Sequence, residues 1–138
     1  MLKKNNKVKD YTFASGRRKS STARVRLHSG RKESEINSQL IGKYFPGEIM
    51  RNSWNRPFEL TDTLGKFYIT AKVVGGGKNG QLDAVTHATA KALASLDVEK
   101  FRGPLKSAGL LTRDARIRER RKVGKGGKAR RAKQSPKR

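Results

Sequence analysis

The sequence has no cysteine and only two histidines in 138 residues. Without cysteine the chain forms neither disulfides nor thiolate metal sites, and two histidines are a poor start for a zinc site. No apolar run approaches the ~20 residues that span a membrane as a helix, and the first residues lack the apolar core of a signal peptide. We therefore expect a cytoplasmic protein, or one made inside an organelle, with no membrane, metal, cofactor or small-molecule partner.

Acidic residues are also scarce: 11 Asp and Glu stand against 34 Lys and Arg, which gives a net charge of +23. The excess lies at the two ends of the chain. Residues 1–24 carry eight basic and one acidic side chain, residues 25–112 carry 13 and eight, and residues 113–138 carry 13 and two. A central domain of ordinary charge between two basic arms is typical of proteins that bind nucleic acid or an anionic membrane surface.

This charge distribution predicts a flexible basic N-terminal arm (residues 1–10), a globular domain (residues 11–112) and an extended basic tail (residues 113–138). The tail has too few apolar side chains to offset the entropy of its own ordering, so a polyanion must neutralise and order it. Twenty-six extended residues reach at most ~85 Å. The tail can therefore touch a site well beyond the domain.

Hydrophobic patterning predicts the elements of the central domain. Strand-like alternation begins near Tyr11 and is clearest over residues 23–28 and 66–74, with residues 33–36 as a returning strand. Helical spacing is best over residues 81–96. Weaker elements are a strand or loop over residues 57–62 and helices over residues 39–45, 47–54 and 98–108, the last interrupted at Gly103-Pro104. This order predicts a two-layer α/β (α+β) domain with a mixed sheet.

Three glycines between the strand over residues 66–74 and the best helix match the dinucleotide-binding spacing GxGxxG: Gly75, Gly77 and Gly80. A dinucleotide fold needs another parallel strand after the helix, and residues 98–111 show no strand alternation. We therefore disfavour a nucleotide-dependent enzyme, and no nucleophile, base and acid form a catalytic set. The glycines instead predict a tight turn whose amides, together with Lys78, bind a nucleic-acid phosphate.

Arginine, lysine and hydroxyl side chains crowd residues 16–24, beside a strand start. A solvated charged edge of a sheet would have a similar composition, but bidentate arginines and hydroxyls are good phosphate ligands, so we favour phosphate binding.

Residues 112–122 predict a short helix with Asp114 and Glu119 pairing to arginines and no apolar stripe. The candidate phosphate ligands are Arg17, Arg18, Lys19, Arg24, Lys78, Arg113, Arg116, Arg118, Arg120, Arg121, Lys122, Lys125, Lys128, Arg130 and Arg131.

Aromatic residues are few, only 7% of the chain, and most fall at core-like positions such as Phe45, Phe58 and Phe67. Readers of single-stranded RNA use aromatic platforms on which bases stack. The sequence shows no alternating aromatic platform. We therefore expect recognition of nucleic-acid backbone and shape rather than of bases.

Three stretches resemble the family of small-subunit ribosomal protein nine, in its bacterial or organellar form. They are residues 16–25, residues 75–81 with the small side chains and Lys91 of the following helix, and residues 111–116 with the basic tail ending in Lys137-Arg138. The resemblance runs from about Tyr11 to the last residue. It implies a domain like the second domain of small-subunit ribosomal protein five, with an extended basic C-terminal tail.

The resemblance also implies a structural, non-enzymatic constituent of the head of the small ribosomal subunit, bound to ribosomal RNA (rRNA) beside neighbouring head proteins. It implies that Lys137 and Arg138 meet the anticodon stem-loop of the peptidyl-site tRNA. Pro136 departs from the family's usual ending, and its fixed φ predicts a stiffer tip.

The alternative from composition alone is a general nucleic-acid architectural protein, such as a DNA compaction factor.

Overall fold

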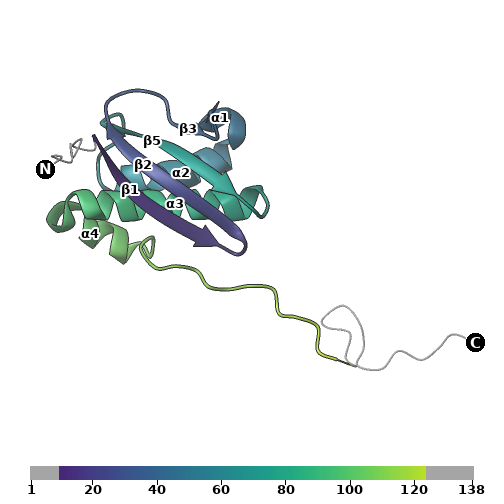
Figure 1. Ribbon diagram of the computed structural model, residues 1–138. Helices are drawn as coiled ribbons and strands as arrows, with labels where there is room; N and C mark the ends of the chain where they lie inside the picture. The colour runs from purple at the N-terminus through teal and green to yellow at the C-terminus, as the bar shows by residue number, and fades with distance from the viewer. Residues whose placement is uncertain (1–9, 124–138) are drawn as a thin grey trace, which may run out of the picture.

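The computed structural model describes residues 10–123. The arm predicted over residues 1–10 and the distal tail, residues 124–138, therefore lie outside the described residues, apart from Asp10. The elements, labelled in Figure 1, are β1 (Tyr11–Arg18), β2 (Ser21–Ser29), β3 (Glu35–Ile36), β4 (Gln39–Leu40), α1 (Ile41–Tyr44), α2 (Glu48–Leu60), β5 (Phe67–Val74), α3 (Lys78–Leu96) and α4 (Val98–Ser107). No helix among residues 10–123 is both long enough and apolar enough to cross a membrane.

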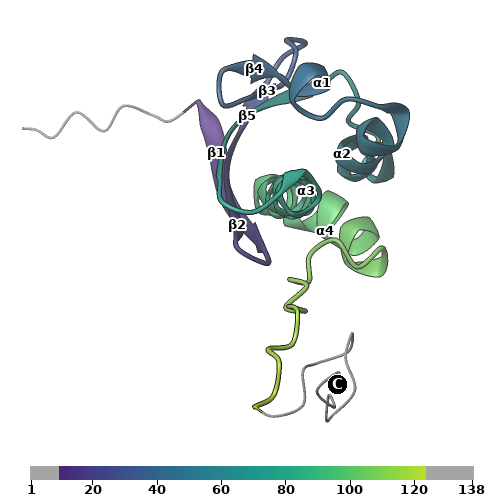
Figure 2. The same ribbon diagram turned by 90° about the vertical axis from the view of Figure 1, so that its right-hand side faces the viewer.

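The strands form one mixed sheet in the order β1-β2-β5-β3-β4, in which only β3 and β5 run parallel. Figure 2 shows the sheet nearly edge-on, with the helices gathered on one side of it. Ala23, Val25 and Leu27 are buried toward those helices, as the alternation predicts. The predicted layer of helices on a mixed sheet is confirmed.

The strand predicted over residues 33–36 is present, but it does not return along β2. β3 spans only Glu35 and Ile36 and pairs parallel with β5 and antiparallel with β4. The reason is that β1 and β5 occupy both edges of β2. The Asn37 side chain fixes this pairing, because its amide bonds the backbone of Val73 at 2.9 and 3.0 Å.

The predicted strand or loop over residues 57–62 is wrong, because α2 continues through Pro57 to Leu60. A proline inside a helix leaves the carbonyl four residues earlier without its donor. Here that carbonyl belongs to Ser53, and the Thr86 hydroxyl of α3 lies 3.5 Å from it but donates to the Leu82 carbonyl at 2.9 Å. Pro57 and Phe58 are both buried, so packing favours the helix.

Three further boundaries differ from the sequence prediction. α3 begins at Lys78, before the predicted residue 81. α4 is continuous through Gly103 and Pro104, where both residues are exposed and the lost hydrogen bond faces water. The helix predicted over residues 112–122 is wrong, since that segment has no regular secondary structure. With no apolar stripe, it has nothing in the domain to pack a helix against.

Candidate nucleic-acid interface

The two glycine-containing stretches of the sequence lie against each other, at the β1–β2 and β5–α3 turns. The Ser21 hydroxyl donates to the Gly75 carbonyl at 3.1 Å. A Cβ on Gly76, whose φ is 63°, would lie 2.1 Å from Ser21 Oγ. Gly75 and Gly76 are therefore required by close packing, which the sequence interpretation missed, whereas a Cβ on Gly77 would have open space. Among the described residues no strand follows α3, so the fold lacks the second parallel strand of a dinucleotide site.

Lys78, predicted to hold a phosphate, lies at the start of α3 against an aromatic ring. Its Nζ is 3.4 Å from the centroid of the Tyr44 ring. The Tyr44 hydroxyl in turn donates to Gln81 Oε1 at 2.7 Å. A cation over an aromatic face is held by the ring quadrupole. Lys78 is nevertheless exposed, so its predicted phosphate contact stays a prediction.

The open face of the sheet, opposite α3, carries exposed cations on adjacent strands. Arg24 on β2 lies directly across from Lys72 on β5, and Arg17 and Arg26 lie on the same face. Like charges directly opposite on neighbouring strands destabilise a sheet unless something neutralises them. Lys72 and Arg26 were missed by the sequence prediction. Period-two alternation with Arg24 identifies Arg26, but only strand register brings Lys72 to this face.

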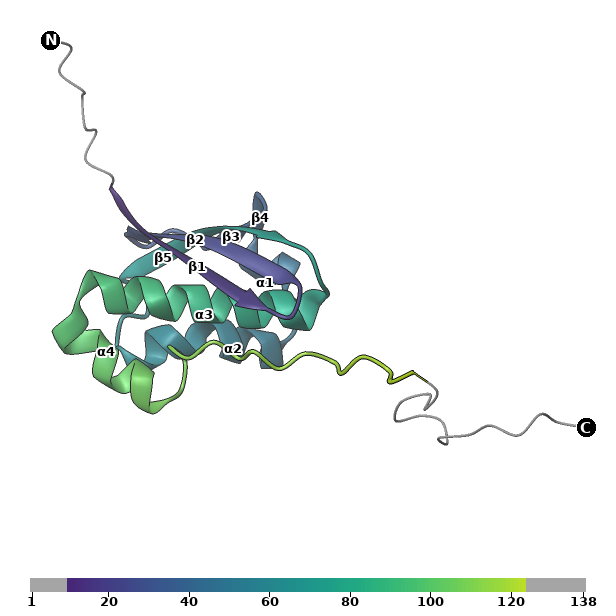
Figure 3. The same ribbon diagram turned by 60° about the horizontal axis from the view of Figure 1, so that its bottom comes forward.

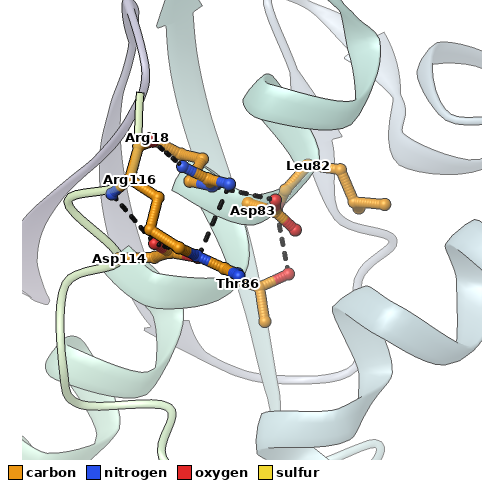
Figure 4. Close-up of polar contacts among 6 residues, drawn as sticks. All are labelled: Arg18, Leu82, Asp83, Thr86, Asp114 and Arg116. Atoms are coloured by element: carbon orange, nitrogen blue, oxygen red, sulfur yellow. Dashed lines mark hydrogen bonds and ion pairs between the residues drawn. The ribbon is translucent and has the colours of Figure 1, made fainter. Parts of the chain in front are cut away.

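Arg18, another predicted phosphate ligand, faces inward instead. Its side chain is 13% exposed and its guanidinium lies 3.5 Å from carboxylates of both Asp83 on α3 and Asp114 in the tail. It also donates to the Arg116 carbonyl. Figure 4 shows Arg18 between the helix and the first residues of the tail. We call Arg18, Asp83, Asp114 and Arg116 the tail-root clamp.

Arg116 completes the tail-root clamp by binding Asp114 along both carboxylate oxygens. Its Nε is 3.0 Å from Oδ1 and its terminal nitrogen is 2.7 Å from Oδ2. The side-chain and backbone donors of Arg116, then the charges of Arg116 and Arg18, hold the pKa of Asp114 well below its ordinary range. The carboxylate conversely raises the pKa of Arg116. The predicted pairing of Asp114 with arginines is confirmed, although in an irregular segment rather than a helix.

Asp114 provides a test of the tail-root clamp by titration. Because its pKa is lowered, the clamp should be present above the ordinary carboxyl pKa and be lost only as the pH falls through the lowered value. We expect Arg116→Gln to raise the pKa of Asp114, and to raise it more than Arg18→Gln does, because the Arg116 side chain is the main cause of the shift. Carbon NMR of the carboxyl group measures this directly.

The control for this titration is Arg113→Gln, which removes a neighbouring cation that makes no bond to Asp114 in the described structure. It should leave the Asp114 pKa nearly unchanged. An ordinary pKa for Asp114 in the wild-type chain would contradict the clamp. Equal shifts for Arg113→Gln and Arg116→Gln would do the same.

His87 on α3 holds the segment that precedes the tail. Its Nε2 lies 3.2 Å from the Leu111 carbonyl oxygen, and burial is the main cause that lowers its pKa. The prediction that His87 is a helical residue rather than a catalyst agrees with this contact. Within residues 10–123, no group of three or more His, Asp or Glu side chains could hold a metal ion.

Beyond the tail-root clamp, residues 117–123 lead away from the domain as an exposed, irregular chain (Figures 1 and 3). The candidate phosphate ligands that are exposed in the described structure are Arg17, Lys19, Arg24, Lys78, Arg113, Arg116, Arg118, Arg120, Arg121 and Lys122. Lys125, Lys128, Arg130, Arg131, Lys137 and Arg138 lie outside the described residues.

A row of aromatic rings crosses the open face, which the sequence interpretation did not foresee. Register places Tyr11, His28 and Tyr68 side by side on β1, β2 and β5. Their ring centroids are 5.6 Å and 4.9 Å apart, and the His28 and Tyr68 rings are stacked at 14°. Local alternation cannot reveal this row, because its residues lie 17 and 40 positions apart in the sequence. The rings pack on one another, so the expectation of no alternating aromatic platform stays a prediction.

Comparison with known proteins agrees with the resemblance. The profile of the family described as "Ribosomal protein S9/S16" matches residues 16–138. The chain is also 45% identical over 119 residues to "Small ribosomal subunit protein uS9" of Maridesulfovibrio salexigens, which covers 86% of this chain and 91% of that protein. A family match over most of the chain and identity at this level lead to one conclusion. The chain belongs to the ribosomal protein S9 family.

Proposed function

We propose that this chain is a structural constituent of the head of the small ribosomal subunit in the cytoplasm, where its exposed cations neutralise rRNA phosphates. Family membership and the net charge of +23 support this function. The observation that carries it is the geometry of the tail: a half-buried arginine clamps its root, and its exposed basic residues lead away from the domain. We further propose that the domain is of the type of the second domain of small-subunit ribosomal protein five.

Because of the tail-root clamp, neighbouring cations have different proposed roles. Arg17 and Lys19 are exposed and free to approach phosphates, whereas Arg18 between them fixes the tail's starting point on β1 and α3. A fixed root lowers the entropy that a tail loses when it binds at a distance. The domain then acts as an anchor that also aims the basic chain.

We propose that the far end of the tail lies beside the peptidyl-site tRNA, with Lys137 and Arg138 as the contacting residues. These residues lie outside the described part, so the support is the family resemblance and the reach of up to ~85 Å. Pro136 should restrict the tip to extended conformations.

Deleting Lys137 and Arg138 should leave subunit assembly intact and weaken tRNA retention at the peptidyl site. Two of the 34 cations are lost, a small fraction for rRNA binding but the whole of the proposed contact. Filter binding of tRNA to programmed small subunits, carrying either the deleted or the full chain, measures the effect. Unchanged tRNA affinity at moderate salt would contradict this contact while leaving the rRNA role intact.

Sedimentation of a native extract tests the broader function. We expect the chain in the small-subunit fraction, and we expect the purified chain to prefer rRNA over duplex DNA at physiological salt. Comparable binding to duplex DNA, with no co-sedimentation, would instead identify a general nucleic-acid architectural protein.

A further inference from the structure

The open face of the sheet is not covered by any element of the described structure. All described helices pack on the opposite side (Figure 2). Exposed or half-buried side chains therefore alternate with buried ones along β1, β2 and β5. Such a face must meet either water or a partner, and its side-chain chemistry decides which partner fits.

The register sorts this chemistry into parallel rows across the strands. The first row is the stack of Tyr11, His28 and Tyr68. The next row places Phe13 beside Arg26. Beyond them lie Arg24 opposite Lys72, and then Arg17. Aromatic planes thus occupy one end of the face and cations occupy the other.

Phe13 is the least expected side chain on this face. It is 54% exposed near the start of β1, opposite Arg26 on β2. Exposing a phenyl ring to water costs free energy, which a stacked partner would recover. It lines a shallow hollow of about 830 Å³ with Arg24, Arg26, Glu35, Asn37 and Lys72. A flat ring beside several cations is suited to a flat, anionic ligand.

The rings of the aromatic row pack against one another. The His28 Nε2 lies 3.0 Å from the Thr70 hydroxyl, and burial, Arg26 and Lys32 lower the pKa of the ring. The lowered pKa favours the neutral form of the His28 ring, which stacks on Tyr68. The Arg26 guanidinium lies 5.0 Å from the Tyr11 ring centroid, which orders both side chains.

We propose that this open face binds unpaired RNA nucleotides, with a base stacked on Phe13 and the sugar–phosphate backbone along Arg17, Arg24, Arg26 and Lys72. The inference rests on the proposed function and deepens it, because it assigns a kind of rRNA structure to a particular face. Unpaired rather than duplex RNA fits, since an A-form helix hides the base planes. Cations outnumber the one acid of the hollow, Glu35, which favours an anionic partner such as RNA over a neutral or basic protein surface.

The test compares Phe13→Ala with Leu64→Ala in the full chain. Leu64 is also 54% exposed but lies in the turn after α2 and does not line the hollow, so it is a matched control. Fluorescence anisotropy with an unstructured RNA oligonucleotide and with an RNA duplex gives the affinities. We expect Phe13→Ala to weaken single-strand binding about tenfold and duplex binding less than twofold. Phe13→Leu, which keeps the apolar area but not the ring, should behave like Phe13→Ala.

A second readout locates the RNA. Photo-crosslinking of a 4-thiouridine oligonucleotide should modify Tyr11, Phe13 or Tyr68. Equal single-strand affinities for Phe13→Ala, Leu64→Ala and the wild type would overturn the proposal. So would defective subunit incorporation of Phe13→Ala with unchanged RNA affinity, because the face would then dock a protein. If the wild-type chain fails to co-sediment with small subunits but the Phe13 effect persists, the ribosomal function fails and the RNA site stands.

Discussion

Replacing Gly16 with alanine is expected to lower the melting temperature of the domain by about 10–20 °C, which corresponds to roughly 2–3 kcal/mol for a domain of this size. A Cβ at Gly16 would lie 2.3 Å from the Ala84 carbonyl oxygen and 2.8 Å from the Ala88 backbone nitrogen. Both atoms belong to the backbone of α3, so relief requires the whole helix to move off β1. Thermal unfolding followed by circular dichroism measures the change.

Gly42→Ala is the matched control for this substitution. Gly42 lies in α1, and a Cβ there would have no neighbour within 4 Å. Alanine is the better helix former, so Gly42→Ala should leave stability unchanged or raise it slightly. Equal melting temperatures for Gly16→Ala and Gly42→Ala would show that the β1–α3 approach is not as tight as described.

The close approach at Gly16 also matters for the proposed function. Gly16 brings the end of β1 against α3, which lets Arg18, two residues later, reach Asp83 on that helix. Moving the helix away would lengthen this contact and release the tail root. We therefore expect any folded remainder of Gly16→Ala to show only a slightly raised pKa of Asp114, because Arg116 remains its main partner and Arg18 contributes least to the shift.

Truncation after Thr112 is expected to leave the domain folded while lowering rRNA affinity on the order of 10³-fold at physiological salt. The removed residues carry 13 cations and two acids but contribute no buried side chain in the described part. Each phosphate contact that is lost reduces the slope of log K against log salt by about 0.7–0.9. The slope should therefore become shallower by several units in a salt series with a labelled rRNA fragment.

Asp114→Asn is the control for the truncation. It breaks the tail-root clamp but keeps all 13 tail cations, so its salt slope should match that of the wild-type chain. Any loss of affinity in this variant then measures the aim of the tail rather than its charge. Identical slopes for the truncated and full chains would show that the tail cations do not contact RNA.

The pattern of apolar residues along the sequence predicted the strands and the helix that bury one face at a regular period. The alternation over residues 23–28 and 66–74 follows directly from the two-residue period of a strand with one buried face, and the α3 pattern follows from the helical period. Pro57 was misassigned because the helix through it is favoured by the burial of Pro57 and Phe58, which is a property of the tertiary structure. Proline alone predicts an interruption.

The predicted phosphate ligands also differ in whether local sequence could show their exposure. Arg17 and Arg24 are exposed, as their alternation with buried residues predicts, but Arg18 turned inward because its partners are α3 and a tail residue 98 positions later in the chain. Sequence order cannot show that a cation already has carboxylate partners. The aromatic row was missed for a related reason, since its rings come from three strands.

Charge, composition and motif spacing, which are properties of the chain itself, determined that this protein is a basic α/β domain with a polycationic tail and indicated its family. Tertiary structure alone decided which cations are exposed, where the tail is fastened, and that aromatic rings and arginines share one open face. Those properties depend on strand register and on helix–sheet contact, which bring together residues far apart in sequence. Coulomb attraction and stacking act over a few ångströms of space, whatever the distance along the chain.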